Sequence, residues 1–395
     1  MNSNLSPKTF MVLAGLMIAA GLVLVDQRDA QAGEVTAAPG YKVLEPIRHG
    51  NLTVFPVVAA KSYPTSEFLT LDEGLRSGDV IVTEAGNVQG LIRRRPASAI
   101  RNNVVQANGA QVNRLVLVNN SKRPLLLLAG EIVSGGKQDR VIGKDRIVPA
   151  ESDPVDLSVF CVEPGRWVAT SNNFGASEAM YGSNGRNVGG PVPSAPPPMA
   201  MMVQPSVRGK AMGDKNQAEV WDEVKKQREA VTVAVAGSAP VEAGKISRTT
   251  SYAQVNENAE VKKQVDAVAK PIEQNYQSLI RQLRDRNAVG VVVAVNGRII
   301  WADVFASTDL LEKYWPKLVR SYASEAVVTR AKEMEVGVGQ AQAFLGDMEG
   351  RRETIETEPG IYRQTEASGD GFKAFLLTSL LPKTGFDVHV AKMAE

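Results

Sequence analysis

The densest group of residues that could bind a ligand lies in a glycine-rich segment, residues 130–140. It places Lys137, Gln138 and Arg140 beside two consecutive glycines. Such a turn can present backbone N–H groups and cationic side chains to an anion. Spacing excludes a nucleotide-binding P-loop, because Glu131 stands where that motif needs its first glycine and Gln138 follows the lysine in place of serine or threonine. The segment predicts either a small anion site or a tight turn with solvated charges.

A second group, residues 161–167, combines a thiol, a carboxylate, a guanidinium and an indole. Glu163 and Arg166 could bind each other, or they could hold the charged group of a ligand against Trp167. Cys161 ends an apolar run, where a cysteine is more often a small buried hydrophobe than a nucleophile. We therefore expect a structural ion pair, with ligand binding as the alternative.

Cysteine and histidine are scarce in this chain. The single cysteine and two histidines, His49 and His389, exclude a disulfide framework, a cysteine-rich zinc site and a multi-histidine metal cage. His389 alternates with apolar neighbours, so we predict that it faces the polar side of its strand. A Cys161–His389 dyad would need a tertiary contact that no sequence pattern predicts.

Three carboxylates are the candidates for acid/base chemistry: Glu131, Glu163 and Asp303. Strand alternation places Asp303 between Trp301 and Phe305 on one face, where apolar surroundings would raise the carboxyl pKa as a general acid requires. Asp303 could equally cap the helix that follows it or pair with an arginine. The three together could ligate Ca²⁺ or Mg²⁺, although the chain contains no D-x-D-x-D-G loop. We expect no bound metal, and no cofactor is indicated.

Strands and helices must bring these residues together, and their order predicts an α+β fold. The first half predicts a short helix at 72–76 and an antiparallel sandwich or barrel-like sheet. The closing residues predict strands that could complete that sheet. The predicted strands are 52–60, 80–83, 115–118, 125–128, 155–161, 360–364, 372–379 and 386–390.

Packed amphipathic helices are predicted between the two groups of strands. Residues 182–213, rich in proline and glycine, predict a disordered insertion loop, and a capping box at Asp214 and Gln217 predicts a helix to about Val231. An apolar stripe over 261–283 predicts packing on the protein's own sheet rather than a coiled coil. We expect Pro271 to kink or split that helix.

The clearest local pattern is Asn296-Gly297 between two apolar runs. It predicts a hairpin with a type I′ turn. A helix should follow from Thr308 or Asp309 to about Lys332, and Pro316 should begin a second helical segment within it.

The first 32 residues resemble a secretory signal peptide. An apolar run of sixteen residues, 10–25, precedes Ala30-Gln31-Ala32, which is a small-residue cleavage pattern. As a helix this run rises about 24 Å, shorter than the roughly 30 Å hydrocarbon core. We predict cleavage near Ala32 and export to the periplasm or medium, with an uncleaved N-terminal membrane anchor as the alternative. The mature chain should have no membrane span.

The composition is that of a globular protein. The chain has 395 residues, 44% of them hydrophobic, and its 45 basic and 43 acidic residues leave a net charge of +2. This balance gives no electrostatic attraction to nucleic acid, so we expect a small ligand or a protein as partner.

Several of these segments together resemble the ARG and rhodanese-phosphatase-superfamily-associated protein domain. The resemblance covers residues 45–393 as a single domain and implies no particular reaction. Family members usually carry Asn where this chain has Asp139. The segments are Leu71-Asp72-Glu73 with Gly78, residues 115–120, Pro124 to Leu128, Gly130-Glu131, residues 136–140, Cys161-Val162-Glu163 with Arg166-Trp167, Glu219-Val220-Trp221, Gly290 to Phe305, Tyr314-Trp315 to Tyr322, and the strand of His389.

Two functions remain open from the sequence. The first is an exported, non-catalytic binding or scaffold domain, in which residues 137–140 and 163–167 lock the fold or line a pocket for an anionic ligand. The second is a hydrolase of phosphate- or nucleotide-bearing ligands that uses Glu131, Glu163 or Asp303 as acid and base.

Overall fold

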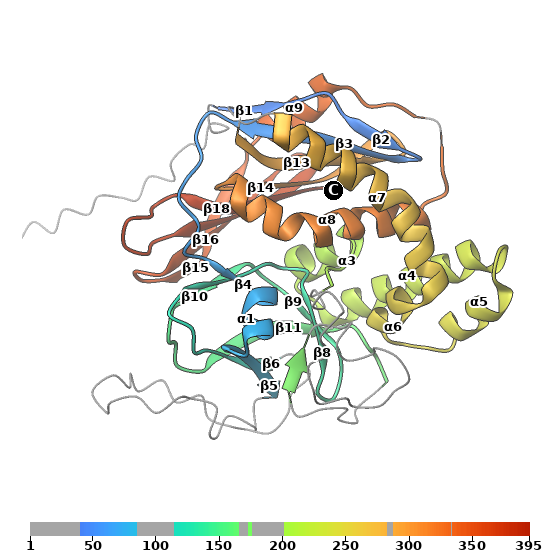
Figure 1. Ribbon diagram of the computed structural model, residues 1–395, viewed down its shortest axis with the longest axis horizontal. Coiled ribbons are helices and arrows are strands. Elements are labelled where there is room, and N and C mark those ends of the chain that lie inside the picture. The colour runs from blue at the N-terminus through green and yellow to red at the C-terminus, as the bar shows by residue number, and fades with distance from the viewer. Residues whose placement is uncertain (1–39, 85–113, 166–172, 176–200, 283–286, 333) are drawn as a thin grey trace, which may run out of the picture. The chain divides into compact units, whose positions relative to one another are not determined.

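A computed structural model describes residues 40–84, 114–165, 173–175, 201–282, 287–332 and 334–395 (Figure 1). Its largest element is a nine-stranded antiparallel sheet in the order β1-β3-β13-β14-β18-β17-β16-β15, with β2 paired to β3. The closing strands therefore do complete a sheet that the first half begins. The strands are β1 (Tyr41–Val43), β2 (Ile47–His49), β3 (Leu52–Ala59), β13 (Asn287–Val295), β14 (Arg298–Phe305), β15 (Arg351–Glu358), β16 (Tyr362–Gly369), β17 (Phe372–Ser379) and β18 (Asp387–Ala394).

The hairpin between β13 and β14 has the predicted turn. Asn296 and Gly297 have φ angles of 52° and 71°, and positive values at both positions define type I′. Val295 pairs directly with Arg298 across the turn, and Val293 pairs with Trp301. This register places Asp303 and both of its aromatic neighbours on the same face of the sheet.

A closed barrel confirms the β-rich body predicted for the first half. Its strand order is β11-β6-β5-β12-β8-β9, and apolar side chains such as Leu117, Val133 and Leu157 fill it. A small three-stranded sheet, β10-β7-β4, adjoins it. The strands are β4 (Leu69–Thr70), β5 (Val80–Glu84), β6 (Arg114–Asn119), β7 (Leu125–Leu127), β8 (Ile132–Gly135), β9 (Arg140–Ile142), β10 (Arg146–Val148), β11 (Val155–Cys161) and β12 (Asn173–Gly175).

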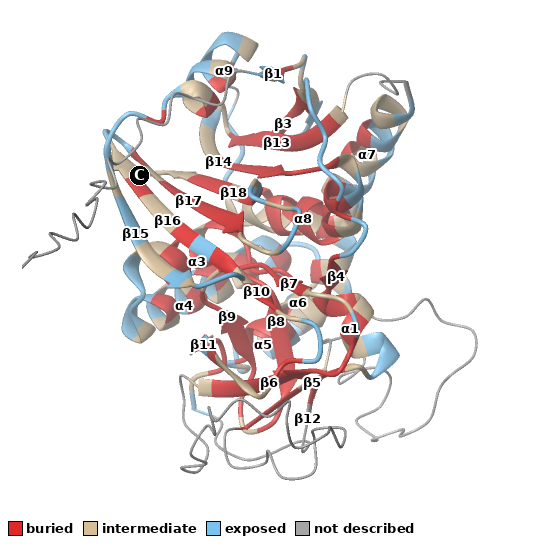
Figure 2. Ribbon diagram, turned by 90° about the vertical axis from the view of Figure 1, so that its left-hand side faces the viewer, coloured by how far each residue is buried: buried red, intermediate tan, exposed pale blue. Residues whose placement is uncertain are grey.

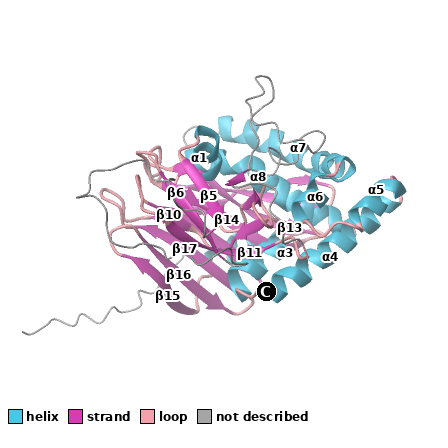
Figure 3. Cartoon of the chain, turned by 90° about the horizontal axis from the view of Figure 1, so that it is seen from below, coloured by secondary structure: helices cyan, strands magenta, loops and turns pink. Residues whose placement is uncertain are grey.

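Most of the helices gather on one side of the strands in Figure 3, whereas α9 packs on the opposite face of the nine-stranded sheet from α7 and α8. Helix α8 packs on β13 and β14. Helix α7 packs on α8 and also contacts β2 and β3, so its apolar stripe does pack on the protein's own sheet as predicted. No helix within the described ranges is long and apolar enough to cross a membrane. The helices are α1 (Leu71–Ser77), α3 (Pro205–Gly209), α4 (Gln217–Ala236), α5 (Pro240–Ile246), α6 (Tyr252–Glu257), α7 (Ala259–Gln282), α8 (Thr308–Val328) and α9 (Val338–Gly346).

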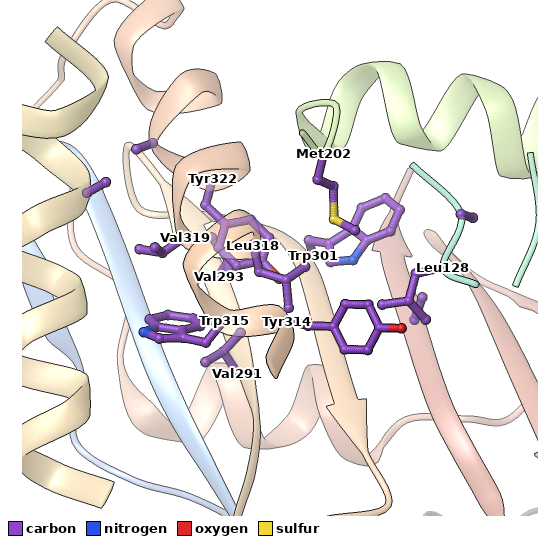
Figure 4. Packing of buried hydrophobic residues seen from close by; sticks show 14 of the residues in the cluster. Leu128, Met202, Val291, Val293, Trp301, Tyr314, Trp315, Leu318, Val319 and Tyr322 are labelled. Atoms are coloured by element: carbon purple, nitrogen blue, oxygen red, sulfur yellow. The ribbon is translucent and has the colours of Figure 1, made fainter. Parts of the chain in front are cut away.

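Both helix-interior prolines lie inside single helices, so the predicted second segment after Pro316 is wrong. Helices α7 and α8 run through Pro271 and Pro316 respectively. A proline in a helix interior costs about 3 kcal/mol, but burying one large apolar side chain recovers about 1.5–3 kcal/mol. Trp315, which is labelled in Figure 4, is 1% exposed. Its ring lies 4.3 Å from that of Tyr276, so packing between the helices outweighs the lost hydrogen bonds.

The last part of the segment predicted as an insertion loop is helical in the structure. Residues 182–200 lie outside the described residues, but α3 and a π-helical turn, Lys210–Asp214, follow them. Pro205 occupies the first turn of α3, a position where proline favours helix formation. Met202, Val207 and Met212 are at most 3% exposed. Apolar burial therefore orders a segment whose composition resembles that of a flexible loop.

Helix α4 begins later than predicted. Its N-cap is Asn216, whose side chain accepts a hydrogen bond from the Ala218 N–H, so the proposed box between Asp214 and Gln217 is absent. Asp214 instead ends the π-helical turn.

Candidate functional site

Asp303 lies at the centre of a buried group of charged residues, which we call the Asp303 cluster. The Arg208 Nη1 atom lies 2.9 Å from both carboxylate oxygens of Asp303. The Tyr322 hydroxyl donates to the same carboxylate, and the His389 Nε2 atom lies 3.0 Å from it. Asp145 completes the cluster through the other ring nitrogen of His389, at 2.6 Å. These residues come from β14, α3, α8, β18 and the turn between β9 and β10.

The polar groups that His389 faces are internal, because its side chain is fully buried between two carboxylates. Burial alone would lower the pKa of His389, but Asp145 and Asp303 raise it above its ordinary value. The imidazole is therefore stabilised in its charged form, with both N–H groups directed at carboxylates.

The pKa of Asp303 shifts in the direction opposite to the prediction. Burial would raise it, but the Arg208 guanidinium and the hydrogen bonds from His389 and Tyr322 hold the pKa of this carboxyl well below its usual range. Of the predicted roles, pairing with an arginine is the one observed. Asp303 is held ionised, which is the wrong state for a general acid.

A second group, the Lys317 cluster, consists of Asp72, Glu131 and Lys317. The Lys317 Nζ atom lies 2.5 Å from a carboxylate oxygen of each acid. Burial would lower the pKa of Lys317, but the two carboxylates raise it. Burial and the charge of Asp72 raise the pKa of Glu131, against the effect of Lys317. Glu131 also accepts a hydrogen bond from the Leu128 N–H at 2.8 Å.

Aromatic rings connect these two clusters. The Phe305 ring stacks 5.5 Å from Tyr314 and lies 4.6 Å from His389. The Lys317 Nζ atom lies 4.6 Å from the centre of the Tyr314 ring. Arg208, in turn, lies 4.7 Å from the Trp301 ring. We call the two clusters and the aromatic rings between them the polar band, which lies between the barrel strands and the nine-stranded sheet.

At Gly130 the backbone passes very close to the Arg208 side chain. The φ angle of Gly130 is +94°, and a Cβ atom there would lie 2.9 Å from Cδ of Arg208. Only glycine lets the chain between β7 and β8 pass this close to the aliphatic part of the Arg208 side chain. Gly130 thus brings Glu131 to Lys317 while leaving room for Arg208.

The glycine-rich turn already binds anions, but they are the protein's own carboxylates. The Lys137 N–H donates to Glu84 at 3.0 Å, and the Asp139 N–H donates to Glu163 at 3.1 Å. The Gly135 N–H donates to the Asp139 carboxylate at 3.2 Å. These three backbone donors, which could have bound an external anion, are therefore occupied within the fold.

We call the residues around this turn the Glu163 cluster: Gln138, Asp139, Arg140, Glu163 and Ser251. The Gln138 side chain donates to the Glu163 carbonyl at 3.1 Å, and the Ser251 hydroxyl donates to Asp139 at 2.9 Å. Arg140 is fully buried, whereas Lys137 is only partly buried. Ser251 is also the N-cap of α6, so this cluster ties the barrel to that helix. Arg166 and Trp167 lie outside the described residues.

Cys161 and His389 lie in different parts of the structure: Cys161 lies beside Glu163, and His389 belongs to the Asp303 cluster. Cys161 is fully buried, as predicted, and its sulfur accepts a hydrogen bond from the Glu163 N–H at 3.3 Å. Burial raises the pKa of the Cys161 thiol, which disfavours the reactive thiolate. The Cys161 N–H donates to the side-chain oxygen of Gln217, and the Cys161 carbonyl accepts from the side-chain nitrogen of Gln217.

The three candidate carboxylates lie in three different clusters and are almost inaccessible. Glu131 and Asp303 are 0% exposed and Glu163 is 3% exposed. Two cavities, of about 290 and 380 Å³, are lined by other residues. Within the described ranges, no group of three or more His, Cys, Asp and Glu side chains is arranged to hold a metal ion.

Several members of the clusters were not predicted from the sequence. Arg208 lay within the predicted loop, and Asp145 lay in a turn with no motif. Lys317 follows Tyr314 by three residues, so a charge on a buried helix face was the available signal. Asp72 and Tyr322 do occur in the segments that carry the family resemblance.

The fold and its buried polar band define an α+β protein with a closed barrel and a large antiparallel sheet. Residues 40–392 match the ARG and Rhodanese-Phosphatase-superfamily-associated Protein domain, and the chain belongs to this family. Comparisons with curated proteins and with solved structures found no match.

Proposed function

We propose that this protein is a non-catalytic binding or scaffold protein in which the polar clusters maintain the fold. The observation that carries the proposal is the burial of Glu131, Glu163 and Asp303, each of which accepts hydrogen bonds from internal partners. A general acid or base must come within hydrogen-bond reach of its substrate. Carboxylates with almost no accessible surface, all bound to internal donors, fit a structural role better.

Export is part of this proposal. The apolar run at 10–25 and the Ala30-Gln31-Ala32 pattern support removal of residues 1–32 and a site of action outside the cytoplasm. A protein in that environment, without disulfides, gains from rigid internal ion pairs.

Two substitutions separate this role from the alternative hydrolase. Asp303→Asn removes the charge that faces Arg208 and His389, and breaking a buried ion pair costs about 3–5 kcal/mol of unfolding free energy. Glu131→Gln should cost less, because the raised pKa of Glu131 makes loss of its charge less costly than at Asp303, whose pKa is lowered. Urea unfolding of the purified mature protein measures both effects, with Glu353→Gln on the exposed part of β15 as control.

The hydrolase alternative gives the opposite result. It requires an activity on nucleotides or sugar phosphates that Glu131→Gln abolishes while the unfolding midpoint stays at the wild-type value. Turnover that disappears without a change in stability would overturn the proposed function.

A further inference from the structure

A cavity of about 290 Å³ lies where the barrel faces the closing strands, and none of its lining residues belongs to the three clusters. One wall comes from the β9–β10 turn and from β11, and the opposite wall comes from β15, β16 and β17. Strands β10 and β16 are in contact beside it (Figure 3). The π-helical turn supplies Ala211 and Met212, so the segment that the sequence analysis assigned to a loop forms part of this wall.

The interior of the cavity is mostly apolar. Phe375 and Met212 are each 2% exposed, and Phe160 lies on the opposite wall. Ligand pockets typically combine such walls with a few placed polar groups, and their volumes begin near 300 Å³. This cavity has the size for one small molecule.

One polar atom in the wall lacks a partner. Gln364 is 1% exposed, and its Oε1 atom accepts no hydrogen bond from the described residues. An unsatisfied buried carbonyl costs about 1–3 kcal/mol. A donor N–H or O–H on a bound molecule would satisfy it.

Cationic groups lie at the more exposed part of the lining. The lining carries two ammonium groups, Lys144 and Lys215, and one carboxylate, Glu356. Glu356 is committed to Lys144 and also accepts from the Tyr362 hydroxyl. Lys215 is 48% exposed, and its pair with Glu366 is a surface ion pair of small energy. Lys215 is therefore the cation available to a ligand.

We propose that this cavity binds a small amphipathic anion, with its apolar body against Phe160 and Phe375, a donor group at Gln364 and its negative charge at Lys215. This inference assigns a ligand class to the binding role proposed above and rests on it. The apolar walls, the acceptor atom of Gln364 and the half-exposed ammonium group of Lys215 each select one part of such a molecule.

A matched pair of fluorescent probes tests the ligand class. 2-Anilinonaphthalene-6-sulfonate carries an apolar body, one N–H donor and a distant sulfonate, and N-phenyl-2-naphthylamine is the same body without the charge. Wild-type protein should bind the sulfonate probe more tightly than the neutral one. Lys215→Glu should weaken binding of the sulfonate by roughly threefold to tenfold at low salt and leave the neutral probe unchanged. Lys263→Glu, on the exposed side of α7, is the matched charge control.

Two further variants locate the probe. Ser158→Trp, at an exposed position on the cavity wall, should abolish binding of both probes, whereas Ser66→Trp on a distant exposed loop should not. Gln364→Leu should weaken both probes by roughly fivefold through the lost hydrogen bond while leaving the unfolding midpoint unchanged or raised. A purely structural role for Gln364 would instead lower stability.

The inference is overturned if neither probe binds, or if binding is indifferent to Ser158→Trp and Lys215→Glu. Neither result would alter the stability and turnover measurements on Asp303→Asn and Glu131→Gln, so failure of the cavity site is distinguishable from failure of the proposed function.

Discussion

His389 is the residue whose state depends most on its tertiary partners. Among the described residues it lies between Asp145 and Asp303, and Arg208 and Tyr322 also reach Asp303. Two carboxylates and two cations make this cluster electrically balanced. Full burial removes the solvent that would otherwise compete for each charge.

This arrangement predicts a loss of stability at alkaline pH. The pKa of His389 is raised in the folded protein, so its contribution is complete below the ordinary value of 6.5 and is lost as the pH rises through the folded value. Asp303 behaves in the opposite sense, since its lowered pKa gives stability that is lost only as the pH falls into the strongly acidic range.

Urea unfolding of wild type and His389→Gln between pH 6 and pH 9 measures the effect. The wild-type free energy of unfolding should decline over this range, and the variant should be less stable at pH 6 with a flatter profile. Parallel profiles for the two proteins would contradict the protonated state inferred for His389.

At the scale of the elements, two features stand out: the edge strand β15 and the turn between β13 and β14. Strand β15, at the edge of the nine-stranded sheet, has no buried residue and carries two arginines and three glutamates (Figure 2). Charged edge strands discourage pairing with a second sheet. The β13–β14 turn, by contrast, packs against a neighbouring segment, because a Cβ atom on Gly297 would lie 2.7 Å from the backbone of Met334.

Two glycine substitutions separate turn strain from packing. Gly297 and Gly360 have φ angles of 71° and 73°, but only Gly297 has a close neighbour. Gly360→Ala should cost about 1–2 kcal/mol for the left-handed conformation. Gly297→Ala should cost clearly more, because the Met334 backbone must also move. Equal losses in chemical denaturation would show that the Met334 contact carries no weight.

At the scale of the whole molecule, the polar band joins the barrel side to the large sheet. Lys317 on α8 bonds Asp72 on α1 and Glu131, which directly precedes β8. Arg208 and Asp145 make the equivalent connection to β14 and β18. Buried ion pairs of this kind specify one arrangement of packed elements, since any other leaves a charge unpaired.

Removing the charge of Lys317 should therefore destabilise the barrel and the nine-stranded sheet together. Lys317→Met leaves Asp72 and Glu131 without their shared partner and should cost about 3–5 kcal/mol. Hydrogen exchange should then accelerate in β6 of the barrel and in β13 of the sheet alike. Lys263→Met, at a side chain that is 76% exposed, is the control. Faster exchange confined to one of the two strands would contradict the connecting role of the band.

Local patterns alone determined much of the secondary structure. Alternation and turn residues predicted the β13–β14 hairpin, the barrel strands β5, β6 and β11, and the closing strands β16, β17 and β18, because strand and turn preferences depend on neighbours in sequence. The apolar stripe of α7 likewise predicted its packing. The family resemblance indicated residues 45–393 and included Asp72, Glu131 and His389.

Only the tertiary structure decided which charges meet. Asp145 and His389 are 244 positions apart in sequence, and Lys317 and Asp72 are 245 apart. Neither pair has a local signal. The direction of the Asp303 pKa followed from Arg208, which local composition had placed in a loop. Burial and long-range electrostatics depend on the whole fold, so they turned a predicted general acid into an ionised partner of buried cations.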